Sequence, residues 1–141
     1  MKKPLIIIIV GIGLFAGAIY WSKSLQSKDP SIISRSGIHW HPIVEIYVAG
    51  VKEEIPANVG LGAVHQPLHT HVEDAQNGVI HMEFDGLVKQ EDTELGNFFK
   101  IWGKDLRSFG GNLQMTVNGK ENTEFENYHM KEGDKIELRY E

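Results

Sequence analysis

The chain begins with an uninterrupted apolar run, PLIIIIVGIGLFAGAIYW at positions 4–21, which carries no charged residue. Its length lies near the lower end of the roughly 17–25 residues that a membrane-spanning helix needs. At 141 residues, the chain has room for one domain besides this run. We therefore predict a membrane anchor or signal peptide at 1–21, a Ser-rich linker of mixed charge at 22–36, and one domain at 37–141.

Charge sets the expected orientation of the apolar run. Lys2 and Lys3 precede it and favour a cytoplasmic N-terminus, so that the chain would be a single-pass cell-membrane protein with an extracytoplasmic C-terminal domain. A cleaved signal peptide is the alternative, because AGA at 16–18 has the small residues that a signal peptidase accepts. The run continues past that point to Tyr20 and Trp21, aromatic residues suited to a membrane interface. We interpret it as a retained anchor.

The composition of the exported part excludes several classes of protein. The chain has no cysteine, which rules out a disulfide framework, a thiolate zinc site, an iron–sulfur site and a cysteine nucleophile. A hydrophobic core must hold the domain, and about 105 residues can supply one. Without Lys2 and Lys3 the chain keeps 12 basic and 19 acidic residues, a charge of -7. Nucleic acid is therefore not expected as a partner, since phosphate binding needs clustered lysine and arginine.

Alternating apolar and polar residues predict several strands in the domain. Between positions 38 and 48 one face is apolar and the other carries His39 and His41. A turn at Ala49-Gly50 leads to a return strand at 51–55. Alternation recurs at 68–73 and 79–84, again with the histidines outside the more apolar phase. The last third predicts a hairpin turned at Asn118-Gly119 and a final strand whose inward residues are Ile136, Leu138 and Tyr140.

One segment, EDTELGNFFKIWGKDL, predicts an amphipathic helix. Leu95, Phe98, Phe99 and Trp102 recur at helical spacing and form one apolar stripe. Asp92 or Thr93 can cap its start, and Gly103 can end it. A helix with one apolar side needs a sheet to cover, so we predict an α+β fold with this helix packed on one face of a mixed or antiparallel sheet.

Two resemblances extend this prediction. The segment MTVNGKE…MKEGDKIELRY resembles the closing strands of β-grasp (ubiquitin-like) domains, which implies a β-grasp-like sheet. The longer pattern HWHP…IPAN…HTH…NGVIH…LGNFF…WG…VNGKE is similar to a family of short, membrane-anchored extracytoplasmic bacterial and archaeal proteins. That resemblance implies one compact exported domain and carries over no catalytic residue.

Six of the seven histidines lie between positions 39 and 81. A histidine pair with one intervening residue points both rings to the same face of a strand, close enough to chelate one ion. Two such pairs and a fifth histidine occupy the phase opposite the apolar positions. We predict that these five converge on the open face or at one end of the sheet and bind a metal: His39, His41, His69, His71 and His81. Glu73, Asp74 and Glu83 are candidates to add oxygen ligands or to orient a ring.

The chemistry of the ligands narrows the choice of metal ion. Imidazole without thiolate suits zinc, copper(II), nickel or non-haem iron, and we choose copper(II) or zinc. Met82 and Met115 fall in the core phase and are interpreted as packing residues rather than copper(I) ligands. His65 lies in a glycine-rich loop and His129 is interpreted as structural. Binding should weaken as the pH falls through the imidazole range, because protons compete with the metal.

Three functions follow as alternatives. The first is a membrane-anchored domain that binds a transition metal for delivery or buffering, with a possible partner among envelope proteins. The second is a metal-dependent enzyme, since His69-Thr70-His71 after a glycine-rich loop resembles the His-x-His motif of cupin metalloenzymes. The sequence departs from the cupin pattern, because both Glu73 and His81 follow this motif too closely. The third is an adaptor that binds an envelope protein without metal, for which the histidines should be dispersed over the surface.

Overall fold

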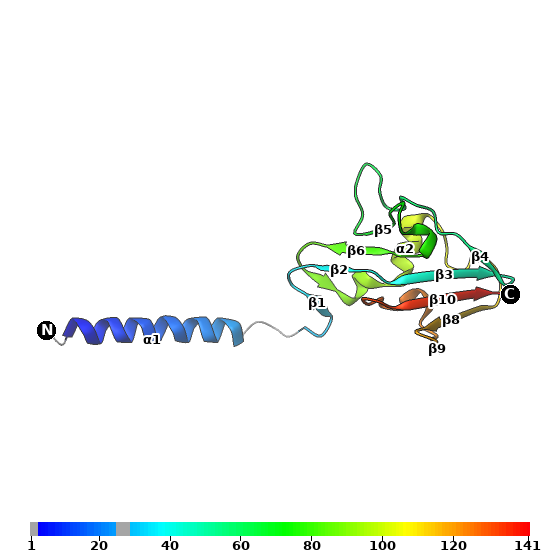
Figure 1. Cartoon of the computed structure of the whole chain (residues 1–141). Helices are drawn as coiled ribbons and strands as arrows, with labels where there is room; N and C mark the ends of the chain where they lie inside the picture. Colours follow the sequence, from blue (N-terminus) through cyan, green and yellow to red (C-terminus); the bar gives the residue numbers. More distant parts are fainter. Residues whose placement is uncertain (1–2, 25–28) are drawn as a thin grey trace. The chain divides into compact units, whose positions relative to one another are not determined.

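A computed structural model describes residues 3–24 and 29–141, and the chain divides into two units between residues 30 and 31 (Figure 1). The first unit contains helix α1, Lys3–Ser24. Its segment Ile6–Ser24 is long and apolar enough to cross a membrane, and its side chains are exposed. This is the apolar helix that the sequence predicts, and its length and composition fit either a membrane anchor or a signal sequence. Lys2 lies outside the described residues.

The predicted linker at 22–36 overlaps regular structure at both ends. Helix α1 continues to Ser24, and strand β1, Ile32–Ser34, pairs with β7, Val88–Lys89, in a two-stranded sheet. The compact domain therefore begins at residue 31 rather than at 37. Strand β1 has only three residues, too few for its alternation to be recognised in the sequence. Residues 25–28 of the predicted linker lie outside the described part of the chain.

The second unit is an α+β fold around a five-stranded mixed sheet. Its central strands β3 and β10 run parallel, and the other neighbours are antiparallel. Across the sheet the order is β4 (Val51–Glu53), β3 (Ile43–Val48), β10 (Lys135–Tyr140), β8 (Leu113–Val117) and β9 (Lys120–Glu121). In Figure 1 the cyan β3 lies beside the red β10, although they are separated by most of the domain sequence.

Both predicted hairpin turns are confirmed. Ala49 and Gly50 have φ angles of 48° and 80°, and Asn118 and Gly119 have φ angles of 52° and 77°. Positive φ at both central residues matches the twist of the two flanking strands, which is why Asn-Gly favours this turn. The return strand after the first turn is Val51–Glu53, shorter than the predicted 51–55.

The predicted strand at 38–48 is divided between two sheets. Its first part, β2 (Ile38–Trp40), joins β6 (His81–Phe84) and β5 (Leu68–His69) in a three-stranded sheet of order β2-β6-β5. The division falls at Pro42, which has no N–H to give to a strand ladder. Its carbonyl accepts the Ile80 N–H at 2.9 Å, and the Ile43 N–H turns to the Asp134 carbonyl at 2.7 Å. The prediction of one sheet is wrong in this respect, since the described residues form three.

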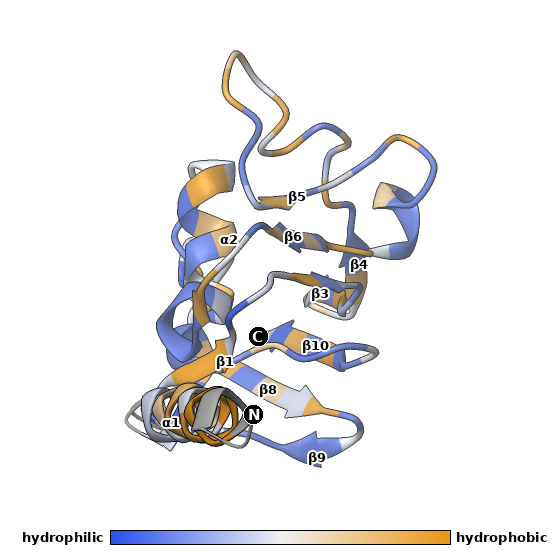
Figure 2. Cartoon of the chain, turned by 90° about the vertical axis from the view of Figure 1, so that its left-hand side faces the viewer, coloured by the Kyte–Doolittle hydropathy of each residue, from blue (hydrophilic) through white to orange (hydrophobic). Residues whose placement is uncertain are grey.

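The predicted apolar stripe of the helix is confirmed. In α2 (Leu95–Trp102) the side chains of Leu95, Phe98 and Phe99 are buried, and Trp102 is partly buried against the same core. Gly103, with φ of 75°, ends the helix. Figure 2 shows α2 along one side of the succession β5, β6, β3, β10, β8 and β9. The helix therefore covers one face of the strands.

The start of the helix differs from the prediction. Residues Gln90–Thr93 form a separate 3₁₀ turn, η2, and Glu94 is the N-cap of α2 without a side-chain cap bond. The Thr93 hydroxyl donates instead to the Gln90 carbonyl at 2.8 Å. Two further 3₁₀ turns are η1, Ala75–Asn77, and η3, Phe125–Asn127.

The predicted alternation at 68–73 holds only for its first two residues, which form β5. His69 and Thr70 are both fully buried, whereas Val72 is 65% exposed. The reason is a neighbouring loop: the Thr70 N–H donates to the Val59 carbonyl at 3.1 Å, and its hydroxyl donates to Pro56 at 2.8 Å. A loop that covers the open face of a strand removes the polar phase on which the prediction depended.

Candidate metal centre

The candidate metal centre lies on one face of the three-stranded sheet. The register pairs His39 of β2 with Glu83 of β6, and His69 of β5 with His81 of β6. Residues two apart in a strand share a face, so His81 and Glu83 lie on the same face of the central strand. One step further along the β2–β6 register brings His41 opposite His81. The sheet pairing thus aligns the histidines of three separate segments.

The opposite face of this sheet is apolar and holds it in place. Trp40 and Leu68 are the partners of Met82 on either side of β6. Leu68 and Met82 are buried in the core, and Trp40 packs against it. Because side chains alternate along a strand, burying this face fixes which residues face the other way. The hydrophobic core therefore orients the histidines without a metal.

His81 lies at the centre of the cluster. Its ring centre is 4.5 Å from that of His71, 4.8 Å from His41, 5.5 Å from His69 and 6.4 Å from His39. Within each pair the ring centres are 4.7 Å and 4.8 Å apart. The structure therefore brings together all five histidines that the sequence singles out. The adaptor alternative expected dispersed histidines, so this arrangement favours metal binding over it.

Two overlapping groups have ligand atoms within 4.8 Å of one another, and both include His81. The inner group is His69, His71, His81 and Glu83, and the outer group is His39, His41 and His81. In the inner group the Nε2 atoms of His69 and His71 are 3.2 Å apart. Tetrahedral zinc with bonds of about 2.0–2.1 Å places its ligand atoms about 3.3–3.4 Å apart. These two nitrogens are already separated by almost the distance that one shared ion requires.

Hydrogen bonds indicate which nitrogen carries the proton in the buried His69 and the half-buried His81, and His69 Nε2 itself lies within hydrogen-bond distance of His71 Nε2. Nδ1 of His69 lies 3.0 Å from the Gln66 carbonyl, which can only accept, so we assign the proton to Nδ1 and the lone pair to Nε2. Nε2 of His81 lies 3.1 Å from the Asp74 carboxylate, which leaves the lone pair on Nδ1. That Nδ1 is buried and has no hydrogen-bond partner in the described structure. Metal-bound histidines usually donate their other N–H to a carboxylate or a backbone carbonyl.

Burial favours the neutral form of His69. The ring is fully buried, and loss of hydration lowers its pKa, an effect partly offset by the Gln66 carbonyl. The loop above it approaches closely at Gly60, where a Cβ would lie 2.5 Å from the Leu68 carbonyl oxygen and 3.1 Å from the His69 Cβ. A neutral imidazole is the form that binds a metal, so burial keeps this ring ready for a ligand role.

The outer group is more exposed and is joined to carboxylates. His39 Nε2 lies 3.1 Å from Glu83 Oε1. His41 Nδ1 lies 3.6 Å from Glu132 Oε1, and the other oxygen of Glu132 accepts the His41 backbone N–H at 2.6 Å. The side chains of His39 and His41 are 62% and 38% exposed. This pair is therefore more accessible to solvent ions than the fully buried His69.

The acidic residues around the cluster were predicted in part. Asp74 and Glu83 contact His81, as the sequence suggests for oxygen ligands or orienting groups. Glu73 is exposed and belongs to neither group. Glu132 was missed, because it lies 91 residues from His41 and follows no local pattern. Only the parallel pairing of β3 with β10 brings the turn that carries it beside β2.

The two remaining histidines have different surroundings. The ring of His65, which the sequence places in a loop, lies 4.5 Å from that of His69, so it adjoins the cluster as a sixth member. His129 lies elsewhere, where its Nδ1 bonds the Gln90 carbonyl at 2.8 Å and its backbone bridges to Glu94. These contacts give His129 the structural role that the sequence predicts.

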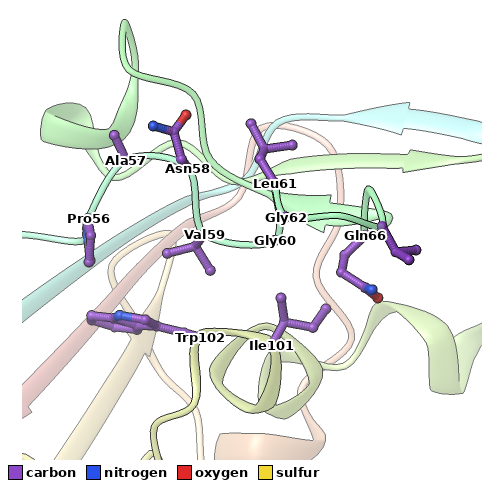
Figure 3. Close-up of a pocket in the computed structure, with 11 residues that line it drawn as sticks. Pro56, Ala57, Asn58, Val59, Gly60, Leu61, Gly62, Gln66, Ile101 and Trp102 are labelled. Carbon is purple, nitrogen blue, oxygen red and sulfur yellow. The ribbon is translucent and has the colours of Figure 1, made fainter.

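Two hollows of about 590 Å³ lie in this part of the domain. One borders the cluster and is lined by Ile38, His39, His65, Gln66, Pro67, Glu83, Phe84 and Asp85. The other is more apolar, and Figure 3 shows Val59 facing Ile101 and Trp102 of α2 across it. Its lining contains none of the five predicted ligands. The first hollow is lined by one of the five predicted ligands, His39, and by His65.

Comparison of the chain with protein-family models, with curated protein sequences and with solved structures finds no match in any of the three. The resemblance to membrane-anchored extracytoplasmic proteins therefore stays a prediction.

Proposed function

We propose that this chain is a membrane-anchored, extracytoplasmic domain that binds a transition-metal ion through its clustered histidines, for metal delivery or buffering. The observation that carries the proposal is the buried Nδ1 of His81 between two histidine pairs, which has no hydrogen-bond partner among the described residues. A buried polar atom without a partner is rare and costs free energy. A metal ion in the inner group would satisfy it.

The ligand types favour a borderline transition metal. Three imidazoles and one carboxylate suit zinc or copper(II), whereas calcium and magnesium prefer oxygen ligands. Asp74 and the Gln66 carbonyl support the proposal, because they are the outer partners that commonly orient metal-bound rings. The choice between zinc and copper(II) is left to the measurement below.

Two features of the setting belong to the same proposal. We propose that α1 is retained as the anchor and that Lys2 and Lys3 keep the N-terminus in the cytoplasm. We also propose a β-grasp fold for the domain. The β3–β4 hairpin, the helix, the β8–β9 hairpin and a last strand beside β3 have the order of a β-grasp sheet and support this assignment.

The proposal is tested by calorimetric titration of the full chain in detergent micelles at neutral pH, purified without an affinity histidine tag. Zinc or copper(II) should bind with a dissociation constant of about 1 µM or lower, a free energy of about -8 kcal/mol or better. Absence of binding for both ions would refute the proposal. The enzyme alternative requires in addition an open coordination position and a general base; Glu83 beside the first hollow is the candidate base.

A further inference from the structure

The two histidine pairs differ in accessibility. His69 is fully buried and the side chain of His81 is 13% exposed, whereas those of His39 and His41 are 62% and 38% exposed. The inner group therefore contains one ring that solvent does not reach, beside the half-buried His71 and the 41% exposed side chain of Glu83. An exposed pair meets ions from solvent but keeps more of its own mobility.

Two residues connect the pairs. His81 belongs to both groups, and Glu83 Oε1 lies 3.1 Å from His39 Nε2 and 3.8 Å from His81 Nδ1. An ion held by the outer pair could therefore gain a bond to His81 or Glu83 before it loses one to His39. Exchange of one ligand at a time avoids a fully solvated intermediate.

The other nitrogen of His81 limits how many ions this arrangement holds. Nε2 is bonded to Asp74 at 3.1 Å, so a neutral His81 offers only Nδ1 as a ligand. One lone pair binds one ion. The outer and inner groups must then share His81 in turn rather than be filled together.

The hollow beside the cluster gives a route from solvent. It is lined by His39, His65, Glu83 and Asp85 among other residues. Two carboxylates at its wall attract cations, and His39 and Glu83 belong both to the hollow and to the metal groups. The hollow therefore brings solvent to His39 and Glu83, and its wall also holds His65, whose ring lies 4.5 Å from that of His69.

We propose that the outer pair is a loading position that captures an ion from solvent and passes it, through His81 and Glu83, to the inner group where it is stored. This inference rests on the proposed function. Only metal–ligand bonds are made and broken, and the oxidation state of the ion does not change. One ion is held at a time.

The test compares uptake rate with affinity, using zinc(II) supplied from a chromophoric chelator to the metal-free full chain in detergent micelles. Stopped-flow mixing gives the rate, and competition at equilibrium gives the dissociation constant. In the double variant His39→Ala/His41→Ala, zinc uptake should slow about tenfold or more, while the dissociation constant stays within about threefold of the wild-type value. Zinc release must then slow by about the same factor as uptake, since the dissociation constant is the ratio of the two rates. In His69→Ala/His71→Ala the affinity should fall about 100-fold, the upper end of the effect of disturbing a metal shell.

Controls keep these outcomes interpretable. His129→Ala, outside the cluster, should match the wild type in both measurements, and circular dichroism of each metal-free variant reports folding. His71→Ala alone, at a half-buried ring, replaces the inner double variant if that variant does not fold.

Three results would overturn the inference. Equal loss of affinity in the outer and inner variants would mean one undivided site. Unchanged uptake in the outer variant would mean that the ion reaches the inner group directly. Two zinc ions bound to the wild type and one to the outer variant would mean that the groups fill together. Absence of zinc binding to the wild type is a different failure, that of the proposed function.

Discussion

Replacement of His81 by alanine should separate metal binding from folding. The ring belongs to both ligand groups, so its loss removes one of four ligands from the inner group and one of three from the outer. The metal-free fold depends on it less, because Nδ1 has no hydrogen-bond partner in the described part of the chain and Asp74, with a 41% exposed side chain, can turn to water. We expect the melting temperature of the metal-free variant to stay close to that of the wild type.

The magnitude follows from binding linkage and domain size. Free zinc at about 100 times its dissociation constant stabilises the folded state by about 2.7 kcal/mol. For a domain spanning residues 31–141, 1 kcal/mol shifts the melting temperature by about 4 °C, so zinc should raise it by about 10 °C. If the variant binds 100-fold more weakly, the same free zinc adds only about 0.4 kcal/mol, a shift of about 2 °C.

The assay is thermal unfolding of the full chain in detergent micelles, followed by circular dichroism with and without zinc(II). His129→Ala is the matched control, because that ring bonds the Gln90 carbonyl outside both groups, and it should keep the full zinc-induced shift. A shift in His81→Ala equal to that of the wild type would refute the central position of this ring. A metal-free variant that is unfolded at 25 °C would refute the claim that the core orients the cluster by itself.

Three further outcomes are expected. Asp74→Asn should weaken zinc binding about 10-fold to 100-fold with the fold intact, measured by competition at equilibrium; unchanged affinity would remove Asp74 from the site. Gly78→Ala should destabilise the domain by about 2–4 kcal/mol in urea titration, because Gly78 has φ of 74° and a Cβ would lie 2.1 Å from the Val44 carbonyl oxygen. Burial and the hydrogen bond to Asp134 raise the pKa of Tyr128. The contribution of Tyr128 to the stability of the domain is therefore present below about pH 10 and is lost as the pH rises further. Tyr128→Phe should flatten this alkaline loss of stability, and a variant with the pH profile of the wild type would contradict the assignment.

Local sequence patterns were sufficient to predict the position of a residue where its neighbours in the sequence determine its conformation. Alternation placed Val44 and Ile46 in the core because a strand with one buried face permits no other phase. Both hairpin turns followed from residues that accept positive φ. The same alternation assigned His39 and His81 to the phase that faces away from the core, which is why the ligand candidates could be chosen from the sequence.

The parts that could not be predicted depend on distant contacts. The change of sheet at Pro42 depends on residues 78–80, which continue along the edge of β3. They do so through the backbone hydrogen bonds of Val44 to Gly78 and of Ile80 to Pro42, which no local pattern predicts. The burial of His69 depends on the loop that carries Gly60. Sequence spacing reports which face a side chain takes, but not which strand or loop comes to lie beside it.

The position of β6 explains why a short strand can organise the site. It is the middle strand of its sheet, so His81 has a histidine neighbour on each side, and Met82 between His81 and Glu83 is fully buried. A shift of the strand register by one residue would expose Met82 and bury His81. Because exposing Met82 is unfavourable, the core opposes the register shift that would separate the histidines. Small zinc domains without such a core need the ion in order to fold. Here the imidazoles are held by apolar packing on the reverse face, so that an ion would not be needed to orient them.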